Sequence, residues 1–95
     1  MSVKDSDIDL SPNQERIAQK WLDVFFALER DHGLTSALRL RALFPTDFRN
    51  HQDATRTLQE MKTVGYVWDE FESPSLWHRT LSGLEESRRL GITPT

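Results

Sequence analysis

The sequence contains no cysteine, so disulfide bonds and metal sites with thiolate ligands are excluded. It has only four glycines, and they form no glycine-rich phosphate-binding loop. No apolar run approaches the ~20 residues that a membrane-spanning helix needs. Residues 1–7 lack the basic and apolar regions of a signal peptide. We therefore expect a cytoplasmic protein with no membrane association.

Motifs for catalysis and for metal binding are also lacking. His32, His51 and His78 fall in separate parts of the chain, without an HExxH or other paired spacing. Acidic residues cluster at 69–72 and at 85–86. On an edge strand such charges discourage pairing with other chains, which explains them better than acid–base chemistry. We expect no enzymatic activity, no cofactor and no metal.

The chain also lacks an excess of positive charge. It carries 12 basic and 15 acidic residues, for a formal net charge of −3, whereas a small DNA-binding domain usually has a basic balance or a basic face. Residues 1–10 account for much of the deficit, with one lysine against three aspartates. The rest is close to neutral, which disfavours tight nonspecific DNA binding but leaves a specific contact open.

A chain of 95 residues is expected to form one domain. Residues 1–10 are acidic and aperiodic and predict a flexible arm, followed by a single domain over residues 11–95. Ser11 and Pro12 suit the start of a first helix that ends near Gly33. Its apolar stripe consists of Ile17, Trp21, Leu22, Val24, Phe25 and Leu28. Phe26 lies off this stripe.

A second, short helix is predicted over residues 35–44, ending at Pro45. We expect it to be largely buried, because Leu38 and Ala42 form one apolar face and Leu40 forms another with residues 43–44. Phe48 is expected to fill the gap before the next helix.

The next helix, over residues 51–64, has the clearest signals. Asn50 is a good N-cap, and Asp53 places a carboxylate at the positive end of the helix dipole. Its inward face is predicted from the helical spacing of Ala54, Leu58 and Met61. Gly65 stands where a left-handed residue ends a helix. Two strands, 66–71 and 76–81, then flank a turn at 72–75, and a last short helix is expected over 82–90.

This order of helix, glycine and hairpin resembles the recognition helix and wing of winged helix-turn-helix transcription regulators of the MarR and ArsR type. The resemblance rests on Ala54-Thr55-Arg56-Thr57-Leu58, Met61 and Gly65-Tyr66-Val67, with the stretch 77–85 similar to the end of the second wing strand. It covers about two thirds of the chain and speaks to fold more than to activity. It implies a mainly α fold with a small β-hairpin (α+β), a winged helix-turn-helix, and a small transcriptional regulator that binds the major groove of double-stranded DNA.

Under this hypothesis the outward face of the 51–64 helix reads DNA. Arg56 can contact guanine and Gln52 adenine, each through two hydrogen bonds. Other predicted DNA contacts are Thr55 and Gln59 on the helix, and Arg39, Arg41 and Arg49 toward phosphates. The alternative is a solvated helix face in which Arg56 pairs with a carboxylate one turn away, at position 53 or 60.

The second hypothesis is a winged-helix protein-interaction adaptor or inhibitor, of a kind encoded by phages or mobile elements, that does not bind DNA. The acidic residues at 69–72 would be repelled by phosphates within a Debye length of about 8–10 Å. The same hairpin is rich in aromatic residues, which are common anchors of interfaces. The predicted interface residues are Phe26, Trp68, Phe71 and Trp77. A homodimer is expected and is compatible with either hypothesis.

Overall fold

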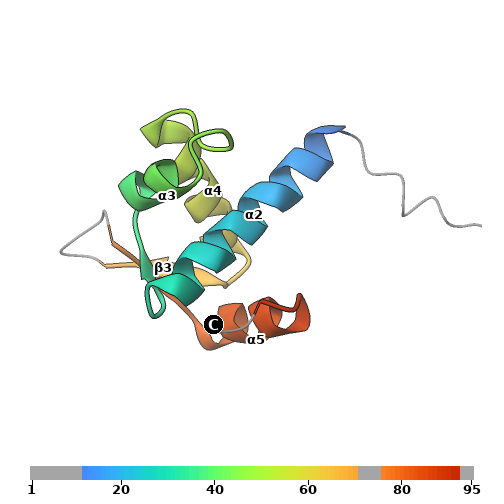
Figure 1. Cartoon of the computed structure of the whole chain (residues 1–95). Helices are drawn as coiled ribbons and strands as arrows, with labels where there is room; N and C mark the ends of the chain where they lie inside the picture. The colour runs from blue at the N-terminus through green and yellow to red at the C-terminus, as the bar shows by residue number, and fades with distance from the viewer. Residues whose placement is uncertain (1–11, 71–75, 93–95) are drawn as a thin grey trace, which may run out of the picture.

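A computed structural model describes residues 12–70 and 76–92. Within these ranges the chain is mainly helical, with four helices and a small antiparallel sheet (Figure 1). The elements in order are α2 (Pro12–Arg30), β2 (Leu34–Thr35), α3 (Ala37–Leu43), α4 (His51–Thr63), β3 (Val67–Asp69), β4 (Trp77–Arg79) and α5 (Leu81–Arg89). The predicted arm at 1–10, the Ser11 cap, Phe71 and the turn at 72–75 lie outside the described residues, as does the side chain of Ile17.

The sheet has three strands rather than the two of the predicted hairpin. β4 is central, with β2 on one side and β3 on the other, all antiparallel. His78 of β4 lies opposite Leu34 on one side and Trp68 on the other. β2 has only two residues, too few to show a period-two pattern, and its pairing with β4 joins residues far apart in sequence. That is why the sequence did not predict it.

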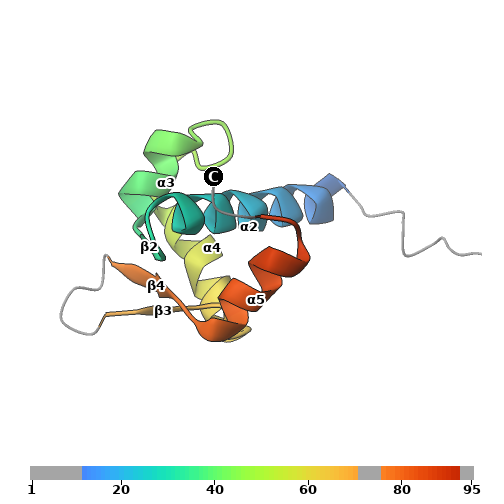
Figure 2. The same ribbon diagram turned by 60° about the horizontal axis from the view of Figure 1, so that its bottom comes forward.

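Helix α2 runs through the middle of the molecule and contacts α3, α4 and α5. In Figure 1, α3 and α4 lie on the side of α2 opposite α5, and in Figure 2 α3 lies above α2 while α4 and α5 lie below it. Its buried face packs against the inner faces of α3 and α4 and against the sheet. The core consists of Val24, Phe25, Ala27, Leu28, Ala37, Leu40, Phe48, Ala54, Leu58, Met61, Val67, Trp77 and Ile92. Trp77 was expected to anchor a partner, but it is only 4% exposed. It cannot do so, because β4 is the central strand and Trp77 points to the face that the helices cover.

Helix α3 begins after Ser36, whose hydroxyl accepts a hydrogen bond from the backbone N–H of Arg39 at 3.1 Å. One half of the prediction is confirmed, because Leu40 is buried and Leu43 and Phe44 pack against the core. The other half is wrong: Leu38 is 66% exposed and Ala42 is also exposed. With seven residues, α3 can bury only one narrow face, and its contacts with α2 and α4 place Ala37 and Leu40 on that face.

Helix α4 follows its prediction closely. The side-chain oxygen of Asn50 accepts from the backbone N–H of Asp53 at 2.8 Å, and Ala54, Leu58 and Met61 are fully buried. Phe48 is buried between α3 and α4, as expected. Gly65 has φ +88°, a left-handed conformation that ends the helix without the strain a side chain would cause.

Helix α5 is capped by Thr80, whose hydroxyl accepts from the backbone N–H of Gly83 at 3.0 Å. A Cβ atom at Gly83 would lie 2.2 Å from the carbonyl oxygen of Tyr66, so only glycine allows α5 to approach the start of β3 this closely. The helix also packs against α2. None of the helices, over the ranges described, is long and apolar enough to cross a membrane.

Candidate nucleic-acid interface

The outward face of α4 is polar and open to solvent. Gln52, Arg56 and Gln59 are exposed and recur at i, i+4 and i+7, which places them on one side of the helix. Thr55 is half-buried beside them. The structure therefore brings together the four residues of this helix that were predicted to contact DNA, including the two predicted base contacts, Gln52 and Arg56.

Two carboxylates, at positions 53 and 60, were expected to compete for Arg56. Glu60 is exposed and forms no ion pair with a described side chain. The carboxylate of Asp53 has another partner. The ammonium group of Lys20, on α2, donates to both carboxylate oxygens of Asp53 at 2.8 and 2.9 Å. This pair is largely buried, with about a fifth or less of either side chain exposed, and it fastens the first turn of α4 to α2. Asp53 is thus withdrawn from the outward face, and Arg56 is not paired with it.

Three exposed arginines lie on α3, on α4 and in the turn between these two helices. Arg41, Arg49 and Arg56 are exposed, and none forms an ion pair with any residue whose side chain the structure describes. Arg49 directly precedes the Asn50 cap of α4, and Arg41 lies on the neighbouring α3. From residue 37 to 63 the sequence holds five basic and three acidic residues, so this region is positive within a chain of net charge −3.

Arg39 is in a different position from the other arginines. Its guanidinium donates to both oxygens of Asp31, at 2.8 and 3.2 Å. This hydrogen-bonded pair holds the pKa of Asp31 below its ordinary value. A phosphate would have to compete with that carboxylate, so Arg39 is the least available of the three predicted phosphate contacts.

The acidic residues of the hairpin are also paired. Lys62, in the last turn of α4, lies 2.7 Å from Asp69 of β3 and lowers the pKa of that carboxyl group. His78 lies 2.6 Å from Glu70. Two of the carboxylates that were expected to repel phosphates thus have a partner within the chain. Glu72 lies outside the described residues.

The outer face of the sheet carries exposed apolar groups. Trp68 is 46% exposed and stacks on His78, with ring centroids 4.4 Å apart and an interplanar angle of 14°. Leu34, opposite His78 on β2, is exposed as well. Val67, the neighbour of Trp68, is buried, as strand alternation predicted. Of the predicted interface residues, Trp68 and Phe26 (54% exposed) are accessible, although they lie on different elements.

Two residues that the sequence analysis did not single out are Asp23 and Asp47. Asp23 is buried on α2, between Leu22 and Val24, and Asp47 lies in the turn between α3 and α4. A signal for Asp23 was present, because an aspartate inside an apolar helical stripe is rarely tolerated without a special environment. Nothing in the sequence indicated that Asp47 would lie beside it.

Within the described ranges no group of three or more His, Cys, Asp or Glu side chains could hold a metal ion. Comparisons of the chain with protein-family models, with curated proteins and with solved structures found no match.

Proposed function

We propose that this chain is a winged-helix protein that binds double-stranded DNA, with α4 in the major groove. The order of elements supports this fold: three helices, then a hairpin whose second strand also pairs with the short strand between the first two helices. In this arrangement α4 is the recognition helix and the β3–β4 hairpin is the wing. The turn between α3 and α4, residues 44–50, is longer than that of a strict helix-turn-helix.

The observation that carries the proposal is an exposed, hydrogen-bonding helix face together with three arginines that form no ion pair with a described side chain. Arg56 and Gln52 have the side chains that recognise guanine and adenine by two hydrogen bonds. Arg41, on α3, and Arg49, just before the cap of α4, are exposed and suited to neutralise phosphates. A face that served only to be solvated would be expected to pair Arg56 with a nearby carboxylate, but Asp53 is paired with Lys20 and Glu60 forms no ion pair with Arg56.

The hairpin is compatible with this role. The Lys62–Asp69 and His78–Glu70 pairs reduce the negative potential that a phosphate backbone would meet near the wing. The wing itself is proposed to add no affinity, since it offers no free cation among its described residues: Arg79 pairs with Glu29 at 3.1 Å.

The test is selection of bound sequences from random duplexes, at about 50 mM salt to favour phosphate contacts. The wild-type chain is compared with Arg56→Ala and with Arg88→Ala. Arg88 is an exposed arginine on α5, away from α4, and serves as the matched control. We expect an enriched motif for the wild type and for Arg88→Ala, with one position relaxed for Arg56→Ala. If no motif is enriched with the wild type, the DNA proposal is wrong.

We further propose that the chain acts as a homodimer, because symmetric dimers place two recognition helices about one turn of DNA apart. Phe26 is more than half exposed on α2, outside the core of the single chain, and is the proposed contact. Sedimentation equilibrium at micromolar concentration measures this directly. A single species of 11.1 kDa would contradict it.

A second candidate function, a protein-binding adaptor or inhibitor, is favoured by the exposed Trp68 and Leu34 on the outer face of the sheet. The two functions depend on different residues. Specific DNA binding should be weakened in Arg56→Ala and unchanged in Trp68→Ala. A chain that selects no DNA sequence, but whose biological activity is lost in Trp68→Ala, would support the adaptor.

A further inference from the structure

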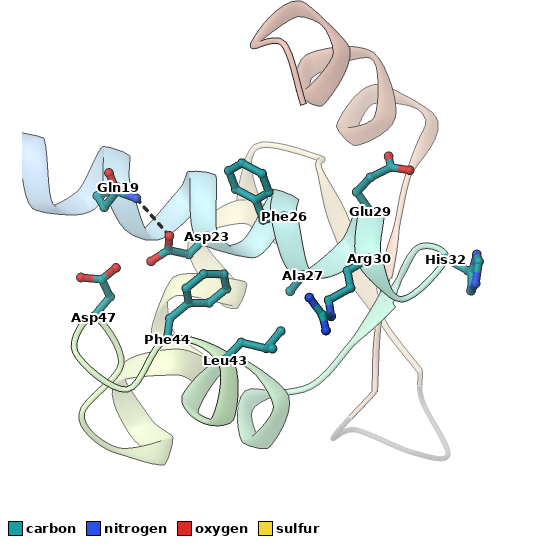
Figure 3. Close-up of a pocket in the computed structure, with 10 residues that line it drawn as sticks. All are labelled: Gln19, Asp23, Phe26, Ala27, Glu29, Arg30, His32, Leu43, Phe44 and Asp47. Carbon is teal, nitrogen blue, oxygen red and sulfur yellow. Dashed lines mark hydrogen bonds between the residues drawn. The ribbon is translucent and has the colours of Figure 1, made fainter. Parts of the chain in front are cut away.

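A pocket of about 1100 Å³ lies along α2, between this helix, the end of α3 and the turn that follows α3 (Figure 3). Its apolar part is formed by Phe26, Ala27, Leu43 and Phe44. At one end stand Gln19, Asp23 and Asp47, and at the other stand Arg30 and His32. Its volume is slightly larger than the roughly 300–1000 Å³ of typical sites for small organic molecules, so such a molecule can be accommodated.

The acidic end contains a buried polar atom without a partner. Asp23 is only 3% exposed, and Gln19 donates to its Oδ1 at 3.0 Å. Its Oδ2 has no hydrogen-bond donor among the described groups. In Figure 3 the carboxyl group of Asp23 faces that of Asp47 across the pocket wall. Leaving a buried carboxylate oxygen without a donor is unfavourable, because the desolvation of the oxygen is not compensated.

Among the side chains that the structure describes, no base is placed to neutralise this pair. Lys20, one turn before Asp23, is committed to Asp53. Arg30 and His32 are at the far end of the pocket, and Arg30 is about 10 Å from Asp23 along the helix. In the free protein a proton takes the place of a base: burial, followed by the proximity of Asp47, raises the pKa of Asp23 to about 7.

We propose that this pocket binds a small organic cation, an ammonium or amidinium group on an aromatic or branched apolar body. The cation would donate hydrogen bonds to Asp23 Oδ2 and to Asp47, replacing the proton that the two carboxyl groups share. The apolar body would cover Phe26, Leu43 and Phe44, with the aromatic rings favouring an aromatic ligand. At the acidic end of the pocket the two carboxyl groups disfavour an anionic ligand. A neutral ligand would leave a carboxylate without an ionic partner once Asp23 is ionised.

This inference goes beyond the proposed DNA binding and does not depend on it. The two are nevertheless close in the structure, because Phe44 and Asp47 belong to the turn that leads to the Asn50 cap of α4. A ligand in the pocket would therefore contact the segment that positions α4.

The test uses 2-phenylethylammonium as the probe and 2-phenylethanol as its neutral counterpart, followed by NMR titration of the full chain without DNA. At about pH 8, where the pair is ionised, we expect saturable shifts at pocket residues with a millimolar or lower Kd for the ammonium. We expect binding of the alcohol to be at least about tenfold weaker, which corresponds to about 1.4 kcal/mol. Equal binding of the two probes, or no saturable shift at millimolar ammonium, would overturn the proposal.

Two variants make the test specific. Asp23→Asn is close in shape and mimics the protonated carboxyl group, so it is expected to fold, and it should weaken ammonium binding about tenfold or more. Glu85→Gln removes one negative charge from an exposed position on α5 and should leave binding unchanged. Equal loss in both variants would indicate nonspecific attraction to an acidic protein, and unchanged binding in Asp23→Asn would exclude the assigned carboxyl group.

The pH dependence provides an independent readout. Between about pH 5.5 and pH 8 the ammonium keeps its charge while the Asp23–Asp47 pair loses its proton, so affinity should rise over this range. The other ionisable groups that line the pocket or adjoin the pair are Lys20, Glu29, Arg30 and His32. His32→Gln separates its contribution. A pH dependence that disappears in His32→Gln and persists in Asp23→Asn would contradict the proposal.

Discussion

The outward face of α4 and the outer face of the sheet are both open to solvent, but they differ in how their charges are matched. On α4, Arg56 has no acidic partner among the described side chains, and Arg41 and Arg49 nearby have none either. On the sheet the carboxylates of Asp69 and Glu70 are both paired. The arginines on and near α4 are suited to bind a phosphate backbone. The paired carboxylates and the exposed Trp68 make the sheet more suited to an apolar contact with a protein. The two surfaces therefore differ in which charged side chains have an ion-pair partner in the folded chain, and not in how many charged residues they carry.

The pocket on α2 adds a third arrangement. There, among the described side chains, neither a lysine nor an arginine pairs with the carboxyl groups of Asp23 and Asp47, and burial favours a shared proton. At the hairpin, by contrast, Asp69 pairs with Lys62 of α4 and Glu70 lies against the ring of His78. Substitutions at each place should therefore differ in size and in pH dependence.

The largest effect on the free energy of unfolding is expected in the core beneath α4, because this helix carries one of the two surfaces and leads into the sheet that carries the other. Leu58 is fully buried on the inner side of α4, and α4 leads directly into β3. Leu58→Ala should lower the free energy of unfolding by about 2–5 kcal/mol, because it leaves a cavity in a packed core. Leu38→Ala, at an exposed position, should change it by no more than about 0.5 kcal/mol. Urea denaturation measures both, and equal values would refute the assignment of the two helix faces.

The carboxyl pair should produce the next largest effect, with a distinct pH dependence. The pKa of Asp23 is about 7 in the folded chain against an ordinary value of 3.8, so the folded state binds more protons than the unfolded state between these values. Stability contributed by this group is therefore present at low pH and is lost as the pH rises through about 7.

Asp23→Asn removes this loss. It should have little effect near pH 4 and should stabilise the protein by at most about 4 kcal/mol near pH 8. Thermal or urea denaturation across this range tests the sign, with Glu85→Gln as a control for net charge. Destabilisation by Asp23→Asn at alkaline pH would contradict the proton-sharing pair.

On the α4 face, Arg56→Ala should weaken specific DNA binding by about 1–3 kcal/mol and relax one position of the preferred sequence. Arg41→Ala and Arg49→Ala should weaken binding to all sequences alike and flatten its salt dependence, as expected of phosphate contacts. Arg39→Ala should act in the same way but less strongly, because its guanidinium is held by Asp31. Binding isotherms at several salt concentrations distinguish these cases. A sequence-specific loss in Arg49→Ala would reverse the assignment.

The smallest effect is expected at the hairpin. Replacing Asp69 and Glu70 with lysine should increase DNA affinity, by less than about 1 kcal/mol for each exposed charge, and should steepen the salt dependence. Asp69→Lys also releases Lys62 from its ion pair. Circular dichroism checks that the hairpin change leaves the fold intact. Unchanged DNA affinity in a folded double variant would place the hairpin away from the nucleic acid.

Much of the helical structure was predictable, because its signals are local. The Asn50 cap, the buried spacing of Ala54, Leu58 and Met61, and the left-handed Gly65 each depend on residues within one or two turns. The prediction failed where local signals were weak or ambiguous. Leu38 and Leu40 are equally apolar, and only contact with the neighbouring helices determined that Leu40 is buried.

The candidate site also has features that local sequence signals fix and features that depend on tertiary packing. The sequence by itself determined which side of α4 faces outward, and hence that Gln52, Arg56 and Gln59 share a surface, because helical periodicity fixes the direction of each side chain. Only the tertiary structure decided which charges remain free. The Lys20–Asp53 pair spans 33 positions and the Glu29–Arg79 pair spans 50. Such ion pairs form only when segments distant in the sequence pack together, so no local sequence pattern predicts them.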